Sequence, residues 1–185
     1  MTTPDFSTDA RWPDVPAVHG WLSLDRRGGW RLKGEPVTHA GLNGFLNANY
    51  HSDSDGKWFV QNGPQRVFVT LDYTPLVLRL DVDGSLTAHT GTATGPAMAA
   101  YLDEDGNVLL QVPQGIGLLD DRDLSAFVEQ CRADDGGPAS DAAFIAVVDG
   151  ASGVGSGVIW HGLPLQPIRH AEVAAHFAFQ PRPEP

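Results

Sequence analysis

The stretch Met98–Val112, MAAYLDEDGNVLLQV, indicates most directly how this chain folds. Apolar segments flank Asp-Glu-Asp-Gly, and Asp and Gly tolerate the left-handed backbone that a tight hairpin turn requires. Trp21–Leu32, WLSLDRRGGWRL, alternates apolar and polar residues on both sides of a second Asp- and Gly-containing turn. We therefore expect a β-hairpin at each of these two places.

The two hairpins open similar series of elements. A Pro/Gly bend, a short helix and further strands follow each of them, and we expect 141–149 to be one of these strands. Gly-x-Pro-apolar followed by His-Ala-x-apolar occurs at Gly34–Leu42 and again at Gly162–Val173. Each series is too small to bury its own helix, so copies must pack on one another or on a shared sheet.

The sequence therefore predicts an α+β fold of mostly antiparallel β-strands with three short helices. It would consist of two repeated hairpin-bend-helix-strand-strand units at 19–90 and 97–179. The small, flexible stretch GTATGP is the expected boundary between them. We expect an extended N-terminal arm at 1–18 and a disordered tail at 180–185.

Charge and composition restrict the partners. The chain of 185 residues has 12 Lys and Arg against 23 Asp and Glu, a net charge of −11. This charge disfavours nucleic acid and anionic membrane surfaces. No apolar run approaches the length of a membrane span, the N-terminus does not resemble a signal peptide, and Cys131 is the single cysteine. We expect a cytoplasmic protein.

The helix patterns identify the side chains that should be buried. Phe45 and Phe127 occupy equivalent inward positions in their helices, where each should pack on its sheet. Cys131 shares the inward face with Phe127, so its thiol should be unreactive. Arg79 lies in the apolar strand LVLRLD, where a solvated face is the favoured position. If it faces inward, Asp72 or Asp81 is the expected partner.

The sequence contains no complete catalytic, cofactor or metal motif. His39 and His170 stand at matching places before two helices, either as paired imidazoles for a metal or proton transfer, or as helix-start residues. HSDSDG resembles a calcium loop but lacks a carboxylate at the first and twelfth positions. The glycine stretch at 150–157 lacks the lysine of a phosphate-binding loop. We expect no zinc, no calcium and no cofactor.

Tryptophans form the second set of candidate ligand or partner residues. An aromatic groove for a peptide or an apolar ligand is one interpretation, and packing in the core is the other. The set consists of Trp30, Trp58 and Trp160.

The first half resembles a known family. The orders L-D-x-x-G-x-W-x-x-x-G-x-P-V, D-G-x-W-F-V and V-F-V-x-L-D-Y-T-P-L-V, within Trp21–Val82, are similar to an uncharacterised bacterial family, domain of unknown function 1285, or a sister family. The resemblance implies an α+β fold with repeated motifs and no established enzyme activity. It also implies at most a proposed part in signal transduction, and it supplies no catalytic residues.

We therefore expect a non-enzymatic, cytoplasmic regulatory or protein-interaction module that binds a protein partner or associates with itself. A small-ligand sensor, with a pocket between the two halves, is the alternative. An enzyme of unknown class is the third hypothesis.

Overall fold

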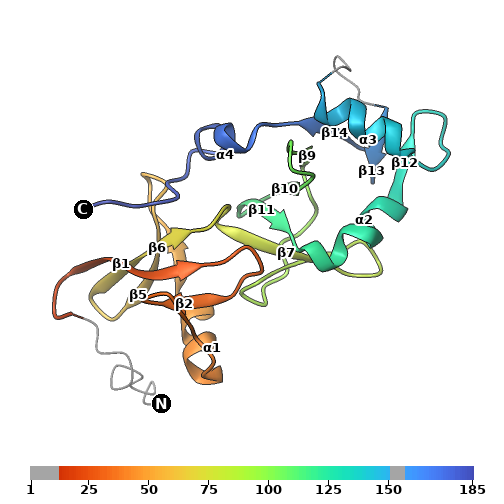
Figure 1. Cartoon of the computed structure of the whole chain (residues 1–185). Coiled ribbons are helices and arrows are strands. Elements are labelled where there is room, and N and C mark those ends of the chain that lie inside the picture. Colours follow the sequence, from red (N-terminus) through yellow and green to blue (C-terminus); the bar gives the residue numbers. More distant parts are fainter. Residues whose placement is uncertain (1–12, 151–156) are drawn as a thin grey trace. The chain divides into compact units, whose positions relative to one another are not determined.

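The structure is a computed structural model that describes residues 13–150 and 157–185. The chain divides into two compact units, and Figure 1 traces the path between them. Unit 1 contains Met1–Tyr73 and Ala178–Pro185, and unit 2 contains Thr74–Phe177. Within the described residues, no helix has the length and apolar content needed to cross a membrane.

The described residues of unit 1 form a six-stranded sheet and one helix. The strands are in the spatial order β3-β2-β1-β6-β5-β4, with β1 and β6 parallel and the other neighbours antiparallel. The elements are β1 (Ala17–Leu24), β2 (Trp30–Leu32), β3 (Glu35–Pro36), α1 (Ala40–Ala48), β4 (Tyr50–Ser52), β5 (Trp58–Asn62) and β6 (Gln65–Leu71).

In unit 2, residues 74–150 and 157–177 form an eight-stranded sheet, three α-helices and a 3-10 turn. Its strand order is β12-β13-β14-β9-β10-β11-β7-β8, with parallel pairs at β14–β9 and β11–β7. The elements are β7 (Leu76–Leu80), β8 (Leu86–Ala88), β9 (Ala99–Leu102), β10 (Val108–Val112), β11 (Gly115–Leu119), η2 (Asp121–Asp123), α2 (Leu124–Gln130), β12 (Cys131–Ala133), α3 (Asp141–Val148), β13 (Val158–Trp160), β14 (Leu163–Pro167) and α4 (His170–His176).

The two sheets have a strand order in common. Read from its other end, the second sheet contains β11-β10-β9-β14-β13-β12, which corresponds strand for strand to the first sheet. The central pairs β1–β6 and β9–β14 are both parallel. Helix α1 connects β3 to β4, and α2 occurs between β11 and β12.

Four hairpin turns use the same local chemistry. Each begins at an aspartate whose backbone N–H donates to the carbonyl four residues later, while the glycine three residues later donates back to the aspartate carbonyl. The four glycines have φ between 73° and 83°, the left-handed region that a side chain disfavours. The first aspartates are Asp25, Asp53, Asp81 and Asp103. Both hairpins predicted from the sequence are confirmed, as β1–β2 and β9–β10.

The α+β class is confirmed, and both sheets are mixed, with one parallel pair in unit 1 and two in unit 2. The described residues contain four α-helices, and the fourth arises because Asp141–Val148 is α3 and not the expected strand. Ser140 caps this helix, since its Oγ accepts from the backbone N–H of Ala143 at 3.2 Å. A short apolar run does not distinguish a strand from a helix, and here the cap and three alanines favour the helix.

The unit boundary also differs from the expected one. Strand β7 pairs in parallel with β11, so β7 and β8 belong to the sheet of unit 2, and the chain passes between units at Tyr73 and Thr74. Most of the expected arm at 1–18 and most of the glycine stretch at 150–157 lie outside the described residues.

The C-terminal segment is ordered against unit 1, which corrects the expected disordered tail at 180–185. The backbone N–H of Leu71 donates to the carbonyl of Pro181 at 2.8 Å, and that of Gln180 donates to the carbonyl of Gly56 at 2.9 Å. Phe179 is buried. A Cβ at Gly56 would overlap the carbonyl of Ala178, so this close approach requires glycine.

Each unit has its own apolar core. Leu22, Leu24 and Val69 are buried in unit 1, and the largest fully buried side chains of unit 2 include Trp160 and Phe127. Phe45 is only half-buried, and Leu46 is the buried residue of α1, so the expectation that Phe45 and Phe127 are equally buried is wrong.

Replacing Phe127 with alanine should lower the free energy of unfolding by about 3–5 kcal/mol, because it would leave a cavity. The ring is 0% exposed and packs on Trp160 with a centroid distance of 5.1 Å. Phe45→Ala should cost less, since that ring is half-buried. Urea unfolding compares the two variants with Ser125→Ala, an exposed change in α2. Equal midpoints for Phe127→Ala and Ser125→Ala would contradict this burial.

Candidate functional site

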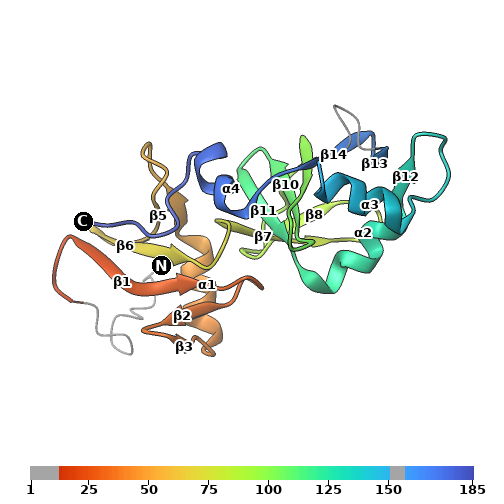
Figure 2. The ribbon, with the colours of Figure 1, turned by 45° about the horizontal axis from the view of Figure 1, so that its top comes forward.

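An apolar pocket in unit 2 is the first feature of the candidate site. Its volume is about 310 Å³, and the β9–β10 hairpin, α2 and α3 form its walls. Figure 2 shows helices α2 and α3, which both line this pocket. All of the lining residues are nonpolar: Leu102, Gly106, Val108, Leu124, Phe127, Val128, Phe144, Ile145 and Val148.

The rim of the pocket leaves large apolar side chains in water. Val128 is 43% exposed and Ile145 is 61% exposed, and both line the pocket. Apart from Asp141, α3 has the sequence AAFIAVV, so every one of its faces is apolar. A helix that is apolar on all sides is normally buried, and contiguous exposed apolar surface typically marks an interaction site.

Acidic side chains flank the lining segments. Asp105 precedes Gly106, Glu129 follows Val128 and Asp149 follows Val148, and all three carboxylates are exposed. The same imbalance extends over unit 2, which has 14 Asp and Glu against 4 Lys and Arg, a formal charge of −10. Nearly all of the chain's net charge of −11 is therefore in the unit that contains the pocket.

Two ion pairs anchor the start of α2. Arg122 donates from Nε and Nη2 to the buried carboxylate of Asp120 at 2.8 and 2.6 Å. These hydrogen bonds lower the pKa of Asp120 to about 2. Arg79 donates in the same bidentate way to Asp123, at 2.6 and 3.0 Å. The backbone N–H of Leu80 also donates to Asp123, so this carboxylate joins η2 to β7.

Arg79 faces solvent, as expected, but it has a partner that the sequence did not suggest. The partner is Asp123, which lies 44 residues along the chain, and neither Asp72 nor Asp81. Asp72 instead pairs with Arg31 at 3.4 Å in unit 1.

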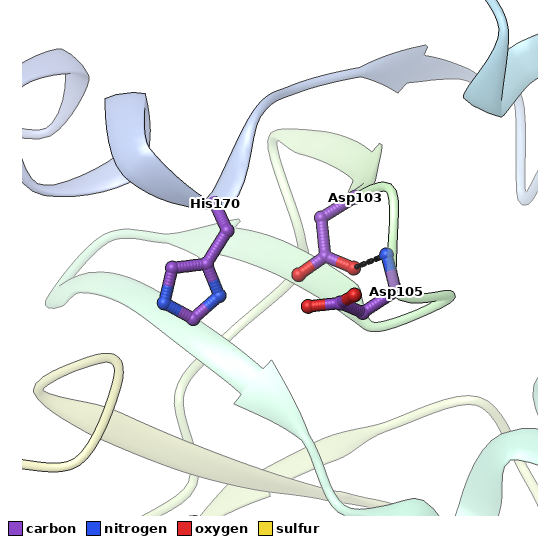
Figure 3. Close-up of side chains that lie close together, drawn as sticks. All are labelled: Asp103, Asp105 and His170. Carbon is purple, nitrogen blue, oxygen red and sulfur yellow. Dashed lines mark hydrogen bonds between the residues drawn. The ribbon is translucent and has the colours of Figure 1, made fainter.

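A cluster of two carboxylates and an imidazole lies at the β9–β10 turn. Asp103, Asp105 and His170 each offer one ligand atom, and these three atoms lie within 4.8 Å of one another. Asp103 is buried, His170 is half-buried and Asp105 is exposed. Figure 3 shows the carboxylates of the turn facing the side of α4 from which the imidazole projects.

Hydrogen bonds hold this cluster from both sides. Oδ1 of Asp103 accepts from the backbone N–H of Asp105 at 3.0 Å and from that of Asn107 at 2.8 Å. The carboxylate of Glu104 accepts from the backbone N–H of His170 at 2.8 Å. This bond lowers the pKa of Glu104 and ties the first residue of α4 to the turn.

The two candidate histidines lie in different units. His39 is the N-cap of α1 in unit 1, where its Nδ1 accepts from the backbone N–H of Leu42 at 3.1 Å. This geometry favours the helix-start interpretation for His39. His170, in unit 2, instead lies beside Asp103 and Asp105.

The three candidate tryptophans are buried. Trp30 and Trp58 both contact Tyr50 in unit 1, with centroid distances of 5.1 and 4.8 Å. Trp160 packs on Phe127 in unit 2. These positions favour core packing over an aromatic groove.

Sequence reasoning missed two parts of the site. It placed Phe127 on the inner face of a helix, but it assigned Phe144 and Ile145, which also line the pocket, to a strand. It treated Asp103 and Asp105 only as turn residues, because their neighbour His170 is remote in sequence. The expected inert thiol agrees with the structure, since burial raises the pKa of Cys131 to about 12.

Two mixed sheets with short helices define an α+β protein. Residues 7–184 match the family DUF2944, described as "Protein of unknown function (DUF2946)", and the chain belongs to this family.

Two solved structures are similar to this chain. A DUF1285 family protein from Silicibacter pomeroyi DSS-3 has a TM-score of 0.50 and 15% identity, over 64% of this chain and 73% of that one. A DUF1285 family protein from Shewanella baltica OS155 has a TM-score of 0.46 and 19% identity, over 58% and 90% of the respective chains. The expected resemblance to domain of unknown function 1285 is confirmed for the fold. No curated protein matches the sequence.

The lowered pKa of Asp120 predicts a loss of stability in acid. The ionised carboxylate stabilises the folded state above about pH 4, and this contribution is lost as the pH falls towards 2. Arg122 is partly exposed, so the expected loss is about 1–2 kcal/mol. Urea unfolding at both ends of this window should show a smaller pH dependence for Asp120→Asn than for the unsubstituted protein. Glu129→Gln, an exposed change in α2, should keep the full pH dependence. If Asp120→Asn also keeps it, the ion pair is not the cause.

Proposed function

We propose that this protein is a non-enzymatic interaction module whose α2–α3 pocket binds a basic amphipathic helix of a protein partner. The observation that carries the proposal is a nonpolar pocket with exposed apolar residues at its rim and carboxylates beside its lining segments. Grooves of this kind accept helices whose apolar residues recur every three or four positions.

The pocket supplies the apolar part of the recognition. Its volume of about 310 Å³ has room for a large aliphatic or aromatic anchor, the type of side chain that dominates binding energy at protein interfaces. Covering Val128 and Ile145 would remove apolar surface from water, at a gain of about 25 cal/mol for each Å² buried.

The negative charge around the pocket favours a positively charged partner. Asp105, Glu129 and Asp149 lie next to lining residues, and unit 2 as a whole has a formal charge of −10. Lys and Arg on the flanks of an apolar helix face would meet these carboxylates. Complementary charge raises the association rate and disfavours acidic partners.

In this proposal the protein is regulatory and cytoplasmic, with a part in bacterial signal transduction. The resemblance of Trp21–Val82 to domain of unknown function 1285 supports the regulatory part. We also propose that the two sheets descend from one repeated hairpin-bend-helix-strand-strand unit, which their common strand order supports.

A small apolar molecule is the second candidate occupant. The same volume lies at the lower end of the range of about 300–1,000 Å³ that is usual for small-ligand sites. The nonpolar lining favours a neutral or cationic amphiphile. This alternative places a sensor pocket within unit 2.

A fluorescently labelled helical peptide of Leu and Lys, with the Leu residues on one face, tests the proposal. Its binding is measured by fluorescence anisotropy. It should bind the full chain, and its affinity should fall as salt is raised. Ile145→Gln should weaken binding at least about tenfold, a change of about 1.4 kcal/mol. Val82→Gln is the matched control, because Val82 is fully exposed but does not line the pocket.

Two results would overturn this assignment. The first is equal binding of a peptide in which Glu replaces every Lys, and the second is equal loss of affinity in the Ile145 and Val82 variants. Binding of a fluorescent fatty amine that Ile145→Gln weakens, without any binding of the Lys peptide, would instead support the small-molecule alternative.

A further inference from the structure

We propose that Asp103, Asp105 and His170 bind one first-row divalent transition-metal ion, with Zn²⁺ as the test ion. None of the three ligands lines the pocket, although Asp105 also precedes the lining residue Gly106. The metal proposal does not depend on the proposed interaction function. It also reverses the sequence-based expectation that the chain holds no metal.

The three side chains have the spacing of a ligand set. Their ligand atoms lie within 4.8 Å of one another. Around one ion with bonds of about 2.0–2.2 Å to nitrogen and oxygen, ligand atoms lie about 3–3.5 Å apart. The exposed side chain of Asp105 can rotate to bring its carboxylate closer to the other two ligand atoms, while the backbones of Asp103 and His170 stay in place.

The backbone around the cluster is already fixed. Asp103 is buried and accepts two backbone N–H groups of its own turn through Oδ1. The side-chain amide of Asn107 also donates to Oδ1 and Oδ2 of Asp103, at 3.0 and 2.8 Å. A metal bound at Oδ2 would take the place of this amide, while the two backbone bonds to Oδ1 stay in place. The bond from the His170 N–H to Glu104 holds α4 against the same turn. Ordering the site therefore costs little conformational entropy.

The donor types select the metal. Imidazole suits zinc, copper, iron and nickel, whereas calcium and magnesium prefer oxygen ligands alone. Three protein ligands with remaining positions for water are typical of open zinc sites. The consecutive carboxylates of Asp103, Glu104 and Asp105 also concentrate negative charge at the turn, which a divalent cation would offset.

A second turn in the same chain provides an internal comparison. Asp53 accepts from the backbone N–H groups of Asp55 and Lys57 at 3.0 and 2.9 Å, as Asp103 does from Asp105 and Asn107. Both turns therefore have aspartates at the same two positions. Among the described residues, only the turn at Asp103 belongs to a cluster of three ligands, because α4 brings His170 to it. The imidazole, and not the acidic turn alone, defines the site.

Competition between the metal-free full chain and a chromogenic chelator for Zn²⁺ tests the proposal. We expect one Zn²⁺ per chain, and His170→Ala and Asp105→Asn should each weaken binding at least about tenfold. His39→Ala and Asp55→Asn are the matched controls, since they remove an exposed histidine and the equivalent aspartate of the other turn. Both controls should bind Zn²⁺ as the unsubstituted chain does.

A spectroscopic measurement separates ligand loss from unfolding. The Co²⁺ form should absorb in the visible range, and His170→Ala should lose this absorption while keeping the circular dichroism of the folded chain. The proposal is overturned if no Zn²⁺ binds, or if the His170 and Asp105 variants bind it as tightly as the controls. Ile145→Gln should leave Zn²⁺ binding unchanged, so failure of the peptide proposal and failure of this one are distinguishable.

Discussion

The whole fold depends on a small constraint, the aspartate–glycine hairpin turn. In three of the four turns, Oδ1 of the first aspartate accepts backbone N–H groups two and four residues later. These bonds, with a left-handed glycine, set the number of residues in the turn and therefore the register of its strands. A slip of one residue in β10 would exchange its two faces, so the buried Leu109 would move to the other face of the sheet.

This dependence explains which parts of the fold could be predicted from the sequence. The hairpins follow from contacts within a few residues, which a local pattern records. The parallel pairs β1–β6 and β7–β11 join segments that are remote in sequence. No residue pattern within one of these strands indicates which other strand it will pair with. Helix α3 was missed for a different reason. Its apolar residues are continuous, so they lack the period that separates a helix from a strand, and the deciding signal was the cap at Ser140.

The candidate site follows the same rule at the level of side chains. One wall of the pocket was predictable, because Leu124, Phe127 and Val128 lie at i, i+3 and i+4, the spacing of one helix face. The Arg79–Asp123 pair and the approach of His170 to Asp103 both require the assembled sheet of unit 2. Single residues with remote partners leave no spacing motif, unlike metal ligands that share a helix or a loop. Sequence reasoning therefore described the frame of unit 2 better than the contacts that could bind a ligand.

The return of the chain to unit 1 has a consequence for folding during synthesis. Unit 2 is one continuous segment, whereas unit 1 combines Met1–Tyr73 with Ala178–Pro185. A ribosome therefore releases every strand of unit 2 before it releases the residues that bond to Leu71 and Gly56. Until then, unit 1 lacks the hydrogen bonds at Gly56 and at the end of β6, whereas unit 2 can already fold. Unit 1 is thus begun before unit 2 but completed after it, and a chaperone that follows the nascent chain would meet unit 1 in its unfinished form.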